Sequence, residues 1–168
     1  LKAKDPAIRL IACALGPFDN PKSSRWNNAL FDRIGKNLDI FDFHTYIGET
    51  FGKSGKNADA LAAAAAMPVA YEQALMEFRG RCLARGLEQV RVDIGEYSFQ
   101  RIVGIHRRVQ TAANLMAYAG WLHGFLRQGD YVLGANATEF SLFNPRNGQF
   151  DSLSPRYDLY RLYAAEAG

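Results

Sequence analysis

The sequence predicts an α/β fold with a parallel sheet, and three observations favour that class. Strand-like apolar runs alternate with helix-like runs along all 168 residues, which is the pattern of successive βαβ units. Two of the strand-like runs are followed at once by polar side chains, as expected where parallel strands end at a common edge. The length suits one domain, since domains commonly have about 100 to 200 residues. We therefore treat residues 1–168 as a single segment.

The first predicted unit is a strand followed by a helix. Residues 8–15 form an apolar run typical of a buried strand, and Gly16 and Pro17 close it. A turn-rich loop comes next. Ser24 is predicted to cap a helix over residues 25–36, in which the apolar side chains keep helical spacing.

The second and third units follow the same order. A strand is predicted over residues 38–43, and the glycine-rich segment 48–57 after it is expected to be a loop. A helical region covers 59–85, with Pro68 in the first turn of its second piece. The third strand is predicted over 89–94.

The fourth unit completes half of an eightfold barrel. A long helix is predicted over residues 106–127 and ends at Gly129, a strand over 130–135 follows, and a last helix covers 155–167. A closed (β/α)₈ barrel usually needs about 250 residues. The chain also begins at Leu1 rather than at a methionine. We therefore expect a processed or excised polypeptide with a partial (β/α)₈ barrel of about four βα units.

Charge and composition exclude several functional classes. The 20 basic and 17 acidic residues nearly balance and are scattered along the chain, which argues against a nucleic-acid partner. No run of about 18 apolar residues is present to cross a membrane. The three histidines lack ligand spacing, and no phosphate loop or dinucleotide fingerprint occurs, so we expect no metal and no cofactor. Cys13 and Cys82 are expected to be buried or partly buried free thiols.

Polar side chains at three predicted strand ends form the candidate site. Glu96 follows the third strand, His44 and Tyr46 follow the second, and Asn136 ends the fourth. In an α/β barrel these ends open into one shared mouth, so the four side chains are expected to converge there. A carboxylate in such a mouth is the first candidate for a catalytic group.

Each of these residues also has a structural interpretation. Glu96 is compatible with a carboxylate paired to a nearby arginine, and His44 alone is more often a structural histidine than a catalytic one. Asn136 suits a loop-capping role as well as a hydrogen bond to a sugar hydroxyl. Asp93, close in sequence to the charge of Arg91, is interpreted as a structural residue of the barrel wall.

Three short motifs occur in the same order as in a known protein family. Asp5-Pro6 precedes the first buried strand, His44-Thr45-Tyr46 follows the second, and Gly95-Glu96-Tyr97 follows the third. In this order the motifs resemble the second half of the catalytic barrel of the α-L-arabinofuranosidases of glycoside hydrolase family 51. The similarity extends to two later segments, Gly129–Asn136 and Tyr157–Tyr163.

The resemblance implies a role for each candidate residue. Glu96 corresponds to the nucleophile that forms a covalent glycosyl intermediate. His44 and Tyr46 correspond to residues that contact the nucleophile and shape the sugar site. The implied activity is the release of terminal arabinofuranosyl residues from hemicellulose-type polysaccharides or oligosaccharides.

One part of the family pattern is missing from the sequence. The general acid/base of the family lies in a Gly-Asn-Glu motif that would precede Leu1, and no such motif occurs in the chain. Glu49 and Glu139 do not match its position. We therefore expect the acid/base to come from a segment upstream, and the activity of this chain alone stays open. The expected partners are a carbohydrate substrate and the missing amino-terminal half of the barrel or a second copy.

Two alternatives remain open at this point. The first is another retaining glycosidase of the same barrel class, such as a xylosidase, an endoglucanase or a glucuronidase. The second is a non-catalytic half-barrel that self-associates or binds carbohydrate. Its physical motivation is that four parallel strands leave two unpaired edges and an open apolar face.

Overall fold

The computed structural model describes six stretches of the chain: residues 2–47, 57–99, 107–138, 143–146, 149–153 and 155–167. The chain forms two compact units. The first unit contains residues 1–45, 70–97 and 125–136, and the second contains residues 46–69, 98–124 and 137–168.

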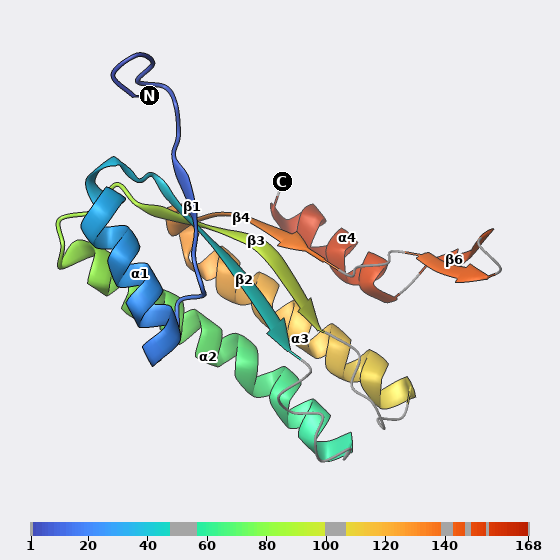
Figure 1. Ribbon diagram of the computed structural model, residues 1–168. Coiled ribbons are helices and arrows are strands. Elements are labelled where there is room, and N and C mark those ends of the chain that lie inside the picture. Colours follow the sequence, from blue (N-terminus) through green and yellow to red (C-terminus); the bar gives the residue numbers. More distant parts are fainter. Residues whose placement is uncertain are drawn as a thin grey trace. The chain divides into compact units, whose positions relative to one another are not determined.

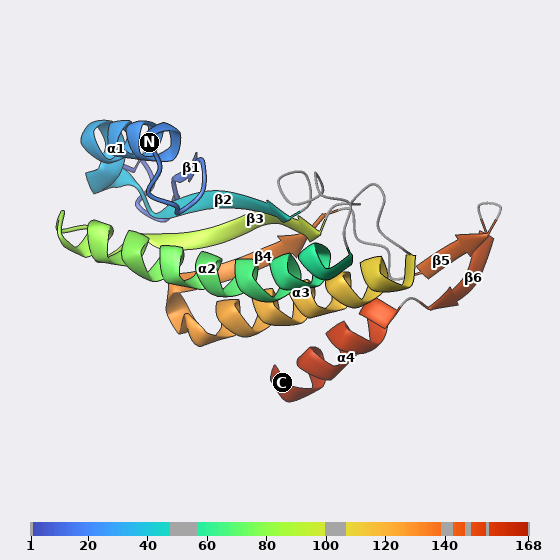
Figure 2. The same ribbon diagram turned by 90° about the horizontal axis from the view of Figure 1, so that it is seen from below.

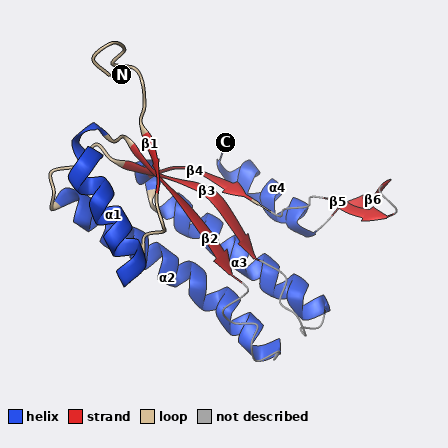
Figure 3. Cartoon of the chain, viewed as in Figure 1, coloured by secondary structure: helices blue, strands red, loops and turns tan. Residues whose placement is uncertain are grey.

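The first unit is built on a four-stranded parallel sheet, which alternates with helices along the chain (Figures 1 and 3). The strand order in the sheet equals the order in the sequence, so each strand pairs with its successor. The strands are β1 (Ile11–Cys13), β2 (Ile40–Ile47), β3 (Arg91–Phe99) and β4 (Val132–Ala137). The sequence prediction of an α/β fold with a parallel sheet is therefore confirmed.

Four helices and one hairpin complete the elements. The helices are α1 (Pro21–Ile34), α2 (Asn57–Leu83), α3 (Arg107–Arg127) and α4 (Pro155–Ala167). Short 3₁₀ turns cover Gly35–Asn37 and Gly129–Tyr131. The hairpin pairs β5 (Phe143–Arg146) with β6 (Gln149–Leu153) in antiparallel fashion. None of the described helices is long and apolar enough to cross a membrane.

The core of the first unit is a cluster of aromatic rings between the sheet and two helices. Phe41 and Phe43 of β2 are fully buried, and both contact Phe78 of α2, with ring centroids 5.1 and 4.9 Å away. Phe31 of α1 lies 5.1 Å from Phe41 and 5.5 Å from Phe78. In Figure 2, β2 and β3 run along the carboxyl-terminal half of α2. These rings therefore shield this face of the sheet from solvent.

Among the described residues, side chains on the opposite face of the sheet, here called the open face, are exposed or half-buried. On β1, Ala12 is buried, whereas Ile11 and Cys13 on either side of it are exposed. Leu15, just after the strand, is also exposed. The expectation of a buried or partly buried Cys13 is wrong, because alternation along β1 turns its side chain away from the helices. Cys82 is a buried free thiol, as predicted.

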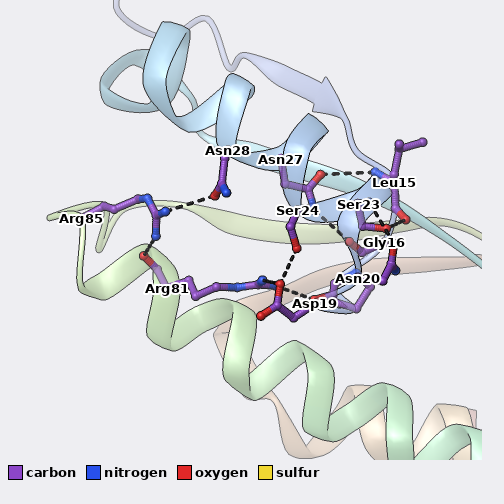
Figure 4. Close-up of polar contacts among 11 residues, drawn as sticks. Leu15, Gly16, Asp19, Asn20, Ser23, Ser24, Asn27, Asn28, Arg81 and Arg85 are labelled. Atoms are coloured by element: carbon purple, nitrogen blue, oxygen red, sulfur yellow. Dashed lines mark hydrogen bonds and ion pairs between the residues drawn. The ribbon is translucent and has the colours of Figure 1, made fainter.

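The connection from β1 to α1 is held by a buried asparagine (Figure 4). The Asn27 side chain donates to the Gly16 carbonyl at 2.9 Å and accepts from the Leu15 N–H at 3.4 Å. Gly16 has φ +95°, a conformation that favours glycine. Asn20 rather than Ser24 caps α1, by accepting a hydrogen bond from the backbone N–H of Ser23 at 3.0 Å.

Arg81 of α2 and Arg85, just after this helix, also hold the connection in place (Figure 4). Arg81 donates to the Pro17 carbonyl at 2.6 Å and pairs with Asp19 at 3.2 Å. Arg85 donates to the Asn28 side chain at 3.1 Å. These contacts span more than 50 residues of sequence and fix the loop that leaves β1.

The second unit has its own aromatic contacts. Tyr118 of α3 packs against Trp121 at 5.9 Å and against Tyr160 of α4 at 6.5 Å. The Tyr163 hydroxyl donates to the carbonyl of Ala119. In the same unit, Gly120 of α3 lies against the Pro68 ring of α2, where a Cβ at Gly120 would come within 2.9 Å.

Several predicted boundaries need correction. β2 continues to Ile47 and β3 to Phe99, so His44 and Glu96 lie within strands rather than after them. The helix α2 runs unbroken through Pro68, because packing along its length outweighs the lost backbone hydrogen bond. The β5–β6 hairpin was not expected, although Asn147-Gly148 between its strands is a common hairpin sequence.

Asp39, directly before β2, ties the amino-terminal segment to the sheet. Its carboxylate accepts from the Leu10 N–H at 2.8 Å and pairs with Lys2 at 2.6 Å and Arg9 at 3.6 Å. Burial alone would raise the pKa of Asp39, but the hydrogen bonds from Lys2 and Leu10 and the charges of Lys2 and Arg9 hold it below its usual value.

We expect Asp39→Asn to lower the unfolding free energy by about 1 to 3 kcal/mol at neutral pH. Because the folded-state pKa is depressed, this stabilisation is present above the ordinary pKa of 3.8 and is lost as the pH falls through the folded value. Urea unfolding of both proteins at pH 7 and at acidic pH measures the difference. An equal gap at both pH values would contradict this assignment.

Candidate active site

Two predicted site residues meet on neighbouring strands of the first unit. His44 on β2 and Glu96 on β3 approach with Nδ1 3.6 Å from Oε2. The other ring nitrogen of His44, Nε2, lies 3.6 Å from Oδ2 of Asp42. The imidazole therefore has a carboxylate at each nitrogen. The side chains of His44 and Glu96 are 40% and 39% exposed, which leaves both within reach of a ligand.

Alternation along β2 explains why Asp42 and His44 share a face. Phe41, Phe43 and Thr45 are buried on the helix side of the sheet. Side chains at successive strand positions point to opposite faces, so Asp42 and His44 lie together on the open side.

The position of Glu96 depends on a break in the alternation of β3. Val92 and Ile94 are fully buried, and a strict period of two would bury residue 96 as well. Instead, Tyr97 is fully buried, and its ring lies 5.4 Å from that of Phe125. Glu96 is thereby turned to the open side, where it meets His44.

Asp42 is a site residue that the sequence reasoning missed. Its Oδ1 accepts a hydrogen bond from the Gly95 N–H at 2.9 Å, across the β2–β3 pair. A Cβ at Gly95 would lie 2.2 Å from the same oxygen, so only glycine leaves room for the carboxylate. The signal for Asp42 was present in the sequence, because it stands two residues before His44 in an alternating strand.

Asp93 occupies the same open face one step further along the sheet. A Cβ at Gly134 of β4 would lie 2.8 Å from its Oδ1. Burial and then the negative charge of Asp42 raise the pKa of Asp93 above its usual value. Arg91 donates to the Glu88 carbonyl at 2.7 Å. Asp93 therefore lies against Gly134 of β4 and near Asp42 of β2, which suits the structural role predicted for it.

We expect Asp93→Asn to raise the unfolding free energy at neutral pH. A raised folded-state pKa means that stability falls as the pH rises from 3.8 through the folded value, because the ionised carboxylate is disfavoured there. The amide removes that penalty. Thermal unfolding should show the gain at pH 7 and little of it at pH 3, and a variant less stable than the wild type at pH 7 would contradict the prediction.

The other two predicted site residues are Tyr46 and Asn136. Tyr46 is on β2, is 39% exposed and belongs to the second unit. Asn136 is exposed on β4. The carboxylates of Glu49 and Glu139 lie outside the described residues. The described residues contain no group of three or more histidine, cysteine, aspartate or glutamate side chains that could hold a metal.

Comparison with known proteins adds information on the fold. The sequence matches no family model and no curated protein. The structure resembles a family 51 α-L-arabinofuranosidase from Bifidobacterium longum, with 17% identity and a TM-score of 0.59 over 83% of this chain and 31% of that one. It also resembles the α-L-arabinofuranosidase of Thermotoga maritima in its arabinose complex, with 18% identity and a TM-score of 0.51 over 83% and 27% of the two chains.

A glucosidase from Croceicoccus marinus is similar as well, with 16% identity and a TM-score of 0.53 over 81% of this chain and 25% of that one. The chain thus spans about a quarter to a third of the length of these enzymes. It has an α/β fold that matches part of a barrel, and this fold is similar to that of glycoside hydrolases.

Proposed function

We propose that this chain is the carboxyl-terminal half of the catalytic (β/α)₈ barrel of a retaining glycosidase, with Glu96 as the nucleophile. The observation that carries the proposal is the contact between Glu96 and His44 on neighbouring parallel strands. Half-exposed polar groups that converge at strands of a barrel-type sheet are typical of barrel active sites. His44 and Tyr46 shape the sugar pocket, and Asn136 donates to a sugar hydroxyl.

The chemistry follows from the carboxylate. The Glu96 oxygen attacks the anomeric carbon while the glycosidic C–O bond breaks, and the leaving oxygen takes a proton from a second carboxylic acid. Water then attacks the glycosyl–enzyme ester, and its proton passes to that second carboxylate. Among the described residues, Glu96 contacts Nδ1 of His44. This favours a catalytic role over a carboxylate that is neutralised by an arginine.

The acid/base residue, in our proposal, comes from polypeptide outside these 168 residues. Asp42 and Glu96 approach opposite nitrogens of the His44 ring. Because Asp42 also accepts the Gly95 N–H, its carboxylate is already engaged by these two groups. The open face carries Ile11 and Leu15, which are 61% and 45% exposed. An amino-terminal half-barrel, or a second copy, would cover these side chains and pair with the free edges of β1 and β4.

Size-exclusion chromatography tests this partner. We expect the chain to elute as an assembly of two or more copies, or to form a complex with the other half of the barrel. A compact 18.7 kDa monomer that remains soluble at high concentration would contradict the half-barrel proposal.

An α-L-arabinofuranoside is the preferred substrate, and the similarity to a glucosidase makes a pyranoside the second candidate. A panel of aryl glycosides distinguishes these sugars by their relative kcat/KM.

A mechanism-based covalent arabinofuranoside inhibitor tests the nucleophile directly. The native preparation is labelled, digested and mapped by mass spectrometry. We expect the label on the peptide that contains Glu96. A label on another carboxylate, with Glu96 unmodified, would overturn the assignment, and a label only with a glucoside inhibitor would support the second candidate.

A further inference from the structure

Asp42 is fixed in place by one of its two oxygens. Oδ1 accepts the Gly95 N–H across the strand pair at 2.9 Å. The space for this oxygen exists because Gly95 lacks a side chain, since a Cβ there would lie 2.2 Å away. The carboxylate is therefore held between β2 and β3 by the backbone itself, and its side chain is only 21% exposed.

The second oxygen faces the histidine. Oδ2 lies 3.6 Å from Nε2 of His44 and 3.9 Å from Sγ of Cys13 on β1. Asp42 and His44 are two residues apart on one strand, so their side chains share a face by necessity. The histidine in turn presents Nδ1 to Glu96.

We propose that Asp42 is a positioning residue, which holds the His44 imidazole against Glu96 through its Gly95-anchored carboxylate. The proposal deepens the proposed glycosidase function and rests on it for the role of Glu96. A ring held at Nε2 is restricted to orientations that keep Nδ1 directed at the nucleophile. Contacts of 3.6 Å are longer than hydrogen bonds, and such contacts commonly shorten when substrate closes the site.

The first test uses the 168-residue chain as it is. Asp42→Asn keeps an oxygen for the Gly95 N–H but removes the charge that faces Nε2. Heteronuclear NMR of the imidazole ring nitrogens of His44 reports which of them carries a proton. We expect Asp42→Asn to shift these signals. The control is Asp93→Asn, which removes a carboxylate from the same face without changing the group at Nε2 and should shift them less.

A second variant tests the same contact from β3. The Cβ introduced by Gly95→Ala would displace Oδ1 of Asp42, so the His44 signals should move in the same direction as in Asp42→Asn. Circular dichroism verifies that each variant is folded. Unchanged His44 signals in folded Asp42→Asn, or shifts no larger than those in Asp93→Asn, would overturn the proposal.

The second test is kinetic and uses a preparation that hydrolyses an aryl arabinofuranoside. Misplacement of a catalytic group can cost on the order of 100-fold in rate, so Asp42→Asn should lower kcat by up to about that factor. KM should change less than kcat, because the displaced histidine contacts the attacking carboxylate. An equal loss of kcat in Asp93→Asn would point to a general effect of charge and overturn the proposal.

The two tests separate this inference from the function on which it rests. Full activity of Glu96→Gln, together with no label on Glu96, would refute the proposed nucleophile. The NMR comparison still decides whether Asp42 holds His44, since it reads the contact in the folded chain without turnover.

Discussion

Glu96→Gln is expected to abolish turnover, with a fall in kcat on the order of 10⁴-fold. The amide has nearly the shape of the carboxylate but cannot form the glycosyl ester. The side chain is 39% exposed and lies at the open face, so its replacement should leave the unfolding free energy within about 0.5 kcal/mol of the wild type. Initial rates on an aryl α-L-arabinofuranoside, together with thermal unfolding, measure both quantities.

Glu88→Gln is the matched control for this prediction. Glu88 is an exposed glutamate just before β3, and its replacement should leave kcat unchanged. If Glu96→Gln retained wild-type turnover, the nucleophile would have to be another residue. If it lost turnover and also unfolded, the carboxylate would be structural, as in the alternative interpretation of a paired strand residue.

Phe78→Ala is expected to have the largest effect on stability, about 3 to 5 kcal/mol of unfolding free energy. The Phe78 ring is fully buried on α2 and contacts the rings of Phe31, Phe41 and Phe43. Its truncation opens a cavity in the contact between sheet and helix, and the parallel strands limit how far the neighbours can collapse. Since whole domains are stabilised by only about 5 to 15 kcal/mol, the variant should be close to unfolding.

Met76→Ala provides the comparison on the same helix. Met76 is 59% exposed, so we expect its replacement to change the unfolding free energy by no more than about 0.5 kcal/mol. Urea unfolding of the two variants and the wild type measures the difference. A loss below about 1 kcal/mol for Phe78→Ala would mean that the ring cluster is not the stabilising core of the first unit.

Local patterns predicted most of the helices. The predicted range 106–127 agrees with α3 to within one residue, and the predicted range 155–167 agrees with α4. Gly129 has φ +53° and stands just after α3, as expected for a residue that ends a helix. These features depend on residues close in sequence, so periodicity and turn residues suffice to locate them.

The same local patterns did not locate the ends of the strands. The ranges 38–43 and 89–94 stop short of the observed ends of β2 and β3. Thr45 and Tyr97, beyond the predicted ends, are buried, and the Tyr97 ring contacts that of Phe125, which is distant in the chain. Pairing and burial against such distant neighbours extend the strands, and this stabilisation leaves little trace in local composition.

Some features of the candidate site were likewise predictable from the sequence, and others depend on the tertiary structure. The sequence by itself determined the α/β class and placed His44 and Glu96 at neighbouring strands, because apolar periodicity and the polar residues that interrupt it are local properties. Only the tertiary structure decided that Glu96 leaves the alternation of β3 and that Asp42 sits in the space left by Gly95. These arrangements depend on the register of two strands about 50 residues apart, which is fixed by packing across the sheet rather than by either strand alone.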